Sequence, residues 1–191
     1  MPRTLFLRQG TRKDLSSALK EITAEKAVIK PATSASAYKT WVTSFPETDE
    51  DEEAFQDQLR SGDVIVQHYL DEIVATGEFS LMFFDKQYSH AVLKRPARHD
   101  FRVQRDFGGT VEAVHPDKAV IDFAYEVLEA IPFELFFARV DVVGAGRKIW
   151  LMEVELIEPV LFFEYLTQSS ERVAKLLIKY ISKQRAGDLS G

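Results

Sequence analysis

The sequence contains no cysteine. That absence excludes disulfide bonds, thiolate nucleophiles and cysteine-ligated zinc, and it is compatible with a reducing compartment. Long apolar runs are also missing. The first residues lack the apolar core of a signal peptide, and no later run approaches the roughly 20 apolar residues that a membrane span needs. We therefore expect a soluble, cytoplasmic protein.

Positive charge is in deficit as well. The 191 residues carry a net charge of −6, with an isoelectric point near 5.3. Nucleic acids and anionic membranes would repel such a molecule as a whole, so neither is expected as a partner. The P-loop lysine motif and the GxGxxG motif are absent, and the nucleotide folds that carry them are not supported. Any phosphate-binding site must therefore depend on local positive charge, because the molecule as a whole is negative.

What the chain does have is enough apolar sequence, 46%, for a continuous core. Helical spacing follows Asp14, a short strand is expected at 27–29, and an acidic run opens a helix that ends near Gly62. From Asp63 onward the pattern is mainly that of strands. This order predicts an α+β protein, with a small α/β lobe over 1–66 and a larger, mostly antiparallel sheet with helices over 67–191.

Two strands near the C-terminal end carry candidate metal ligands. Side chains alternate across a strand, so Arg139 and Asp141 share one face of FFARVDVV, while Glu153 and Glu155 share one face of WLMEVELI. If the two strands pair through the VGAGRK turn, three carboxylates converge in an arrangement that suits Mg²⁺. The same alternation also fits an exposed polar face of an antiparallel sheet.

Lys30 ends a short strand and precedes the loop ATSASAYKT. Ser34 and Ser36 offer hydroxyl and backbone donors for phosphate oxygens, although an ordinary surface loop has the same composition.

A basic stretch, LKRPARHDFRVQRDFGG, contains five cations, namely Lys94, Arg95, Arg98, Arg102 and Arg105. In an acidic protein this is a concentrated positive patch. It fits an anion site, a solvated loop or a weak contact with nucleic acid.

Seven short segments, read in order, resemble the nucleotide-site segments of ATP-grasp enzymes: VIKP, VIVQHYL, GEFS, LKRP, DFRVQRDFGG, ARVDVV and LMEVELIEP. The resemblance extends from Pro2 to about Phe163, and the order of the segments makes it specific. The branch it is most similar to includes bacterial glutathione synthetase, ribosomal-protein glutamate ligase and the ligase of cycloserine biosynthesis. It implies the ATP-grasp fold, with the nucleotide in a cleft between a small and a large lobe.

The resemblance also implies roles for individual residues. Lys30 would hold ATP phosphates, and Glu78 would lie near the ribose. Lys94 and Arg102 would contact phosphates and serve as the catalytic residues, with Arg102 stabilising the transferred phosphoryl group. The adenine would meet a hinge made of Gln67, Tyr69 and Leu70, and the magnesium ligands would be Asp141, Glu153 and Glu155.

The implied activity is that of an ATP-dependent ligase that forms carbon–nitrogen bonds. It would use ATP and Mg²⁺, with Mn²⁺ as an alternative metal, to convert an unidentified carboxylate to an acyl phosphate that an amine or similar nucleophile attacks. Such catalysis depends on positioning and charge neutralisation more than on a side-chain nucleophile.

Two positions depart from the family pattern. Glu155 replaces the Asn that is common at the third metal position, and the loop after Lys30 lacks the usual glycines. By the resemblance, the N-terminal substrate domain of the family is also expected to be absent from this chain. The chain is therefore expected to be a natural short form, a fragment, or one part of a homo-oligomer or of a complex whose partner chain supplies the rest.

Two alternative functions are a nucleotide-binding module without catalysis and a module that contacts nucleic acid through residues 94–105.

Overall fold

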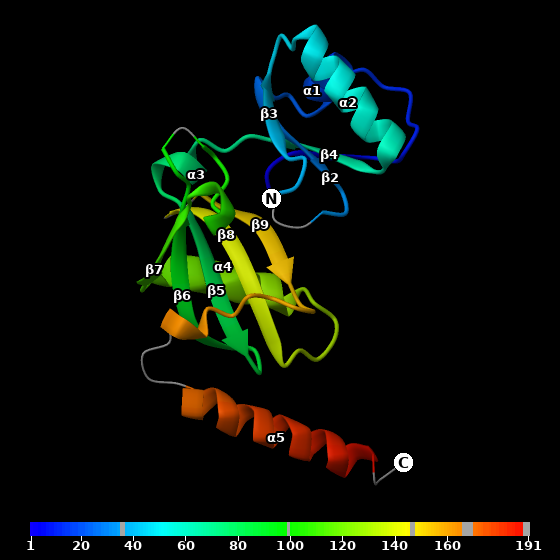
Figure 1. Ribbon diagram of the computed structural model, residues 1–191. Helices are drawn as coiled ribbons and strands as arrows, with labels where there is room; N and C mark the ends of the chain where they lie inside the picture. The colour runs from blue at the N-terminus through cyan, green and yellow to red at the C-terminus, as the bar shows by residue number, and fades with distance from the viewer. Residues whose placement is uncertain (35–36, 99, 146–147, 166–169, 189–191) are drawn as a thin grey trace. The chain divides into compact units, whose positions relative to one another are not determined.

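The computed structural model of the chain comprises two compact units, Met1–Asp71 and Glu72–Gly191 (Figure 1). It describes residues 1–34, 37–98, 100–145, 148–165 and 170–188. Each unit has its own antiparallel sheet and its own apolar core. The predicted α+β class is confirmed.

The first unit is a four-stranded sheet with two helices. Its strand order is β1-β4-β2-β3, and every neighbouring pair is antiparallel. Leu15 and Leu19 from one helix and Phe55 and Leu59 from the other are buried in one cluster with sheet residues such as Ile29. The elements are β1 (Thr4–Leu7), α1 (Leu15–Glu21), β2 (Lys26–Pro31), β3 (Trp41–Ser44), α2 (Asp49–Ser61) and β4 (Val64–His68).

The start of α2 follows from its sequence. The Thr48 side chain accepts a hydrogen bond from the Asp51 backbone N–H, and the Asp51 side chain accepts one in return from the Thr48 backbone N–H. This capping box satisfies donors that have no partner inside the helix. The acidic residues of the first turn also complement the positive end of the helix dipole.

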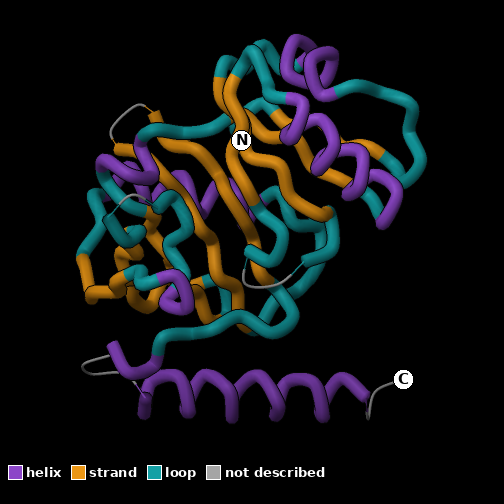
Figure 2. The backbone as a smooth tube through the Cα atoms, turned by 45° about the horizontal axis from the view of Figure 1, so that its top comes forward, coloured by secondary structure: helices purple, strands orange, loops and turns teal. Residues whose placement is uncertain are grey.

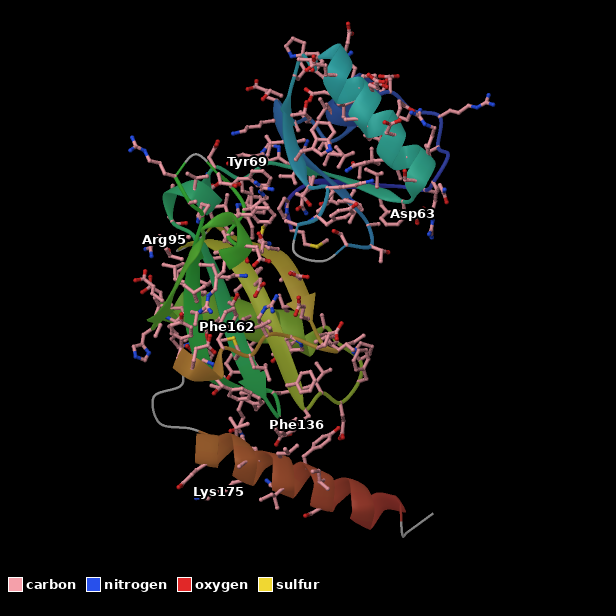
Figure 3. The ribbon with its side chains drawn as sticks, in the orientation of Figure 1. Asp63, Tyr69, Arg95, Phe136, Phe162 and Lys175 are labelled. Carbon is pink, nitrogen blue, oxygen red and sulfur yellow. The ribbon has the colours of Figure 1, made fainter. Side chains whose placement is uncertain are left out.

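The first unit extends through Asp71, whereas the sequence suggested a lobe boundary before Gln67. The reason is that β4 pairs with both β1 and β2, so Gln67 lies inside the first sheet. Tyr69 continues this attachment, because its backbone N–H donates to the Lys26 carbonyl and its ring lies 3.7 Å from the Lys26 ammonium (Figure 3).

The second unit is a five-stranded antiparallel sheet in the order β7-β6-β5-β8-β9. Figure 2 shows this sheet from a second direction. Its strands are β5 (Glu78–Phe84), β6 (Gln87–Arg95), β7 (Thr110–Val114), β8 (Phe137–Ala145) and β9 (Lys148–Glu155). The helices are α3 (Glu72–Ala75), α4 (Lys118–Glu129) and α5 (Ser170–Asp188), with short 3-10 turns η1 (Arg105–Phe107) and η2 (Phe163–Tyr165).

The two faces of this sheet are covered differently. One face packs against α4, whose Val120, Ala124 and Leu128 are buried. On the other face, Met82 and Phe84 form an apolar area that Phe162 covers (Figure 3). The remainder of that face, around the start of β5, is polar.

Helix α5 lies beside the apolar end of the second unit in both ribbon and tube views. The centres of the Phe136 and Tyr180 rings are 5.0 Å apart there. Among the described residues, no helix combines the length and the apolar character needed to cross a membrane.

Candidate functional site

Charged side chains gather on the face of the second sheet that α4 leaves open. Leu81 of β5 packs on the α4 side, and Glu78, three residues earlier, therefore points to the opposite face. Lys94 of β6 lies directly across from Glu78 in the strand register. Arg139 and Asp141 of β8 are buried on this same face.

A bulge brings the glutamates of β9 to this face. Asp141 pairs with Glu153, whereas the next residue, Val142, pairs with Leu151, so Met152 is an extra residue on its strand. Leu151 packs on the α4 side. In a regular strand Glu153 would share that side with Leu151, but the extra residue turns Glu153 to the face of Asp141. The predicted pairing of the two strands is present, while Gly146 and Arg147 of the predicted turn lie outside the described residues. The bulge is a feature that side-chain alternation did not predict.

Lys94 joins two buried carboxylates. Its ammonium nitrogen lies 3.1 Å from Asp141 Oδ2 and also contacts Glu78 Oε1. Burial alone would lower the pKa of Lys94, but the charges of Asp141 and Glu78 outweigh it and hold the pKa above its usual value. Burial raises the pKa of the Glu78 carboxyl. Lys94 is therefore a permanent cation that stabilises both acids, and Glu78, predicted to lie near the ribose, is enclosed beside it.

Arg139 occupies the centre of the carboxylates. Its Nε donates to Asp141 Oδ1 at 2.9 Å, and its Nη2 donates to Asp141 Oδ2 at 3.0 Å. Its Nη1 lies 2.9 Å from Glu155 Oε2, and its Nη2 lies 3.6 Å from Glu153 Oε2. Burial would raise the pKa of Asp141, but Lys94 and Arg139 outweigh it and lower that pKa. Arg139 therefore belongs to the site, and its alternation with Asp141 was the signal available in the sequence.

The charge balance of the cluster fits a divalent cation. Four carboxylates, those of Glu78, Asp141, Glu153 and Glu155, face the two cations Lys94 and Arg139, which leaves two negative charges in excess. Mg²⁺ prefers such oxygen ligands. Burial and the neighbouring acids raise the pKa of Glu153, a repulsion that a cation would relieve.

The predicted metal ligands share one face, but they surround Arg139. Within the described ranges, no three His, Asp or Glu side chains are grouped as a metal site. Asp141, Glu153 and Glu155 are the residues that would hold Mg²⁺, once Arg139 leaves Glu153 and Glu155.

Arg102 lies in the loop between β6 and β7 and has a partner of its own. Its Nε and Nη2 donate to the two carboxylate oxygens of Asp100 at 3.1 and 2.8 Å, and its guanidinium carbon lies 3.6 Å from the centre of the Phe107 ring. These hydrogen bonds from Arg102 lower the pKa of Asp100 to about 2. Any contact of Arg102 with phosphate would require this pair to open.

In the first unit, the structure brings Lys30 and Gln67 together. Lys30 Nζ donates to Gln67 Oε1 at 3.3 Å, and Gln67 Nε2 donates to Thr4 Oγ1 at 3.0 Å. Leu70 is buried.

The loop after Lys30 takes an unusual backbone. Ser34 donates to the Tyr38 carbonyl at 3.0 Å, and Ser36 lies outside the described residues. Ala37 and Lys39 have φ values of 54° and 52°. This left-handed region normally favours glycine. The loop therefore has the conformation that glycine would adopt more easily, although its glycines are missing.

Comparison with known proteins connects this fold to a family. No family model matches the chain. The cycloserine biosynthesis protein DcsG of Streptomyces lavendulae is 32% identical over 125 residues, which cover 60% of this chain and 41% of DcsG. The crystal structure of D-cycloserine synthetase DcsG matches with a TM-score of 0.74 and 25% identity over 94% of this chain and 65% of that one. The chain has the ATP-grasp fold of these enzymes and resembles DcsG in sequence.

Two further ATP-grasp relatives share the fold at lower identity. D-alanine–D-alanine ligase from Bacillus anthracis, solved with ATP, has a TM-score of 0.69 and 14% identity over 98% of this chain and 62% of its own. ATP-grasp ligase PsnB, solved with Mg and ADP, has a TM-score of 0.64 and 18% identity over 93% of this chain and 53% of its own. The resemblance to ATP-grasp enzymes and the fold inferred from the sequence are confirmed. The chain spans about two fifths of the curated DcsG sequence and less than two thirds of these solved chains.

Proposed function

We propose that this chain is the ATP-binding part of an ATP-dependent ligase that joins a carboxylate to an amine or a similar nucleophile. One observation supports this most strongly. The bulge at Met152 turns Glu153 and Glu155 to the face on which Asp141 is buried, which produces an acidic cluster with two excess negative charges in an ATP-grasp fold.

In this proposal, the chain's residues bind the metal and the nucleotide and neutralise phosphate charge. Asp141, Glu153 and Glu155 would hold Mg²⁺, or Mn²⁺ in its place, and the ion would neutralise phosphate charge. Lys94 keeps Asp141 ionised and adds a fixed positive charge for the phosphates. Arg102 would leave Asp100 to meet the transferred phosphoryl group.

The first unit would contribute contacts to the nucleotide itself. Lys30 would bind phosphate, and Gln67, Tyr69 and Leu70 would meet the adenine. Ser34, and Ser36 beyond the described residues, would add phosphate contacts. Glu78 would act near the ribose through its place beside Lys94.

The proposed reaction has two displacements. A carboxylate oxygen of the acid attacks the γ-phosphorus of ATP, the bond to the bridging oxygen breaks, and ADP leaves. The amine then attacks the acyl carbon, phosphate leaves, and the amine loses a proton. No side-chain nucleophile is needed, so positioning and charge neutralisation carry the catalysis.

A second candidate is a nucleotide-binding module that does not catalyse. It is favoured by the glycine-free loop after Lys30 and by the two-fifths coverage of DcsG. In either case, the acid and the amine would be selected together with further structure, from the rest of a longer chain, a homo-oligomer or a partner chain.

Thermal unfolding with Mg-ATP, Mg-GTP and ATP plus chelator tests binding, because a ligand that binds only the folded state raises the unfolding temperature. We expect the largest rise with Mg-ATP. An unchanged transition in all three would contradict the proposal. Release of ADP and phosphate on addition of a panel of acids and amines then distinguishes the ligase from the non-catalytic module, which would bind Mg-ATP without turnover.

A further inference from the structure

Arg139 is held by its three acidic neighbours to different degrees. Asp141 has a side chain only 1% exposed and receives three hydrogen bonds from the guanidinium. Glu155 is 33% exposed and meets Nη1 at 2.9 Å, while Glu153 is 56% exposed and lies 3.6 Å from Nη2. Buried, bidentate pairs are harder to break than solvent-exposed pairs. Arg139 is therefore anchored to Asp141 and attached more loosely to the two glutamates.

The other cation of the cluster does not share this arrangement. Lys94 contacts Glu78 and Asp141, the two enclosed acids. Arg139 is the cation whose contacts reach the more exposed carboxylates, which are the ones a solvent ion meets first. A divalent ion at Glu153 and Glu155 would share their oxygens with the guanidinium and be repelled by its charge.

We infer that Arg139 is a built-in counter-ion of the metal site, which a divalent cation displaces from Glu155 and Glu153 while Asp141 retains it. This inference rests on the proposed function, because it takes these carboxylates as the metal ligands. Arg139 neutralises the acidic face when no metal is bound and weakens metal binding by competing for the same oxygens. Because Arg139 of β8 pairs with Glu155 of β9 in the strand register, the fold keeps the guanidinium beside the carboxylate for which it competes with the metal.

The test is Mn²⁺ affinity in the absence of nucleotide, measured by electron paramagnetic resonance on the whole chain. We expect Arg139→Met to bind Mn²⁺ about tenfold more tightly than the unchanged protein, which corresponds to about 1.4 kcal/mol. Arg95→Met is the matched control, because Arg95 is also an arginine on the second sheet and pairs with the exposed Glu112. Its Mn²⁺ affinity should stay unchanged. Equal or weaker binding by Arg139→Met would overturn the inference.

A second measurement needs no variant and covers the case in which Arg139→Met fails to fold. Mg²⁺ is titrated into the unchanged protein while NMR follows the Arg139 guanidinium protons. We expect the Nη1 signals to shift as Glu155 is released, while the Nε proton keeps the signature of its bond to Asp141. Arg139 signals that do not change up to millimolar Mg²⁺ would overturn the inference.

The two proposals fail in different ways. If Mn-ATP binds and Glu153→Gln weakens it, but Arg139→Met leaves metal affinity unchanged, the function stands and the counter-ion does not. If Glu153→Gln has no effect on Mn-ATP, the metal assignment itself is wrong, and the counter-ion inference falls with it.

Discussion

Lys94 and Asp141 are charged side chains in surroundings that usually exclude charge. Lys94 is 9% exposed, and it is paired with two acids that are themselves buried. Removing one partner of such a group leaves uncompensated charge in the interior, which costs more than the pair contributes. Lys94 therefore stabilises the fold, in addition to its proposed contact with phosphate.

The first prediction concerns this structural role. Lys94→Met leaves Glu78 and Asp141 without their shared cation, so the free energy of unfolding should fall by about 3–5 kcal/mol. Urea unfolding measures it. Lys118→Met is the control in the same unit, because the Lys118–Asp122 pair is exposed and should be worth less than about 1 kcal/mol. Equal small losses in both variants would mean that Lys94 does not support the fold.

The second prediction concerns Asp100 and acid. Its pKa of about 2 lies below the ordinary 3.8, so its contribution to stability is present above pH 3.8 and is lost as the pH falls toward about 2. Asp100→Asn lacks this contribution. Urea unfolding over that pH window should therefore show a smaller acid-induced loss for the variant. Parallel curves for the two proteins would contradict the Asp100–Arg102 pair.

For single residues, the sequence indicated the candidate cations but not most of their partners. Arg102 was expected to contact phosphate, and its bidentate pair with Asp100 was not foreseen. Asp100 precedes it by two residues in a loop, where spacing does not determine whether side chains meet. Arg139 was placed correctly beside Asp141, but its contacts to Glu153 and Glu155 depend on a neighbouring strand.

At the scale of elements, the alternation of side chains predicted the β8–β9 hairpin but not its bulge. Ile149 and Leu151 pack on the α4 side, while Glu153 and Glu155 are turned to the other face. These four residues occupy every second position, so in a regular strand the acids and the core residues would share one face. A change from apolar to acidic residues at alternate positions is therefore a sequence signal for an inserted residue, and Met152 is that residue.

The third prediction concerns the entry to β5. Gly77 has φ +89°, and a Cβ there would lie 2.7 Å from the Lys94 carbonyl oxygen. Gly77→Ala should lower the unfolding free energy of the second unit by more than about 1 kcal/mol. An alanine there would have a strained backbone, and its Cβ would lie too close to the Lys94 carbonyl oxygen. Hydrogen exchange of the sheet amides measures this for each unit separately.

Gly62→Ala is the matched control for this substitution. Gly62 has an extended φ of 176° and no atom within 4 Å of an added Cβ. It should leave the stability of the first unit unchanged or raise it by up to about 1 kcal/mol. An equal loss at both glycines would show that the close approach to Lys94 is not what matters.

At the scale of the whole molecule, the sequence supplied the family because seven short segments occur in the right order. The absence of the P-loop lysine motif and of GxGxxG gave no support to other nucleotide folds, and the fold comparison confirmed the ATP-grasp fold. The boundary between the two units was harder to predict from the sequence. Gln67 belongs to the first unit because β4 is hydrogen-bonded to strands far away in the sequence, a pairing that local patterns do not reveal.

Titration calorimetry with Mg-ATP shows whether the acidic face of β8 and β9 holds the metal of a bound nucleotide. Glu153→Gln should weaken binding at least about tenfold, as expected when a metal site is disturbed. Glu112→Gln is matched to it, since Glu112 is 58% exposed, lies on the same sheet and also pairs with an arginine. We expect Glu112→Gln to bind Mg-ATP like the unchanged protein. Absence of Mg-ATP binding, or unchanged affinity in Glu153→Gln, would contradict this role of the acidic face.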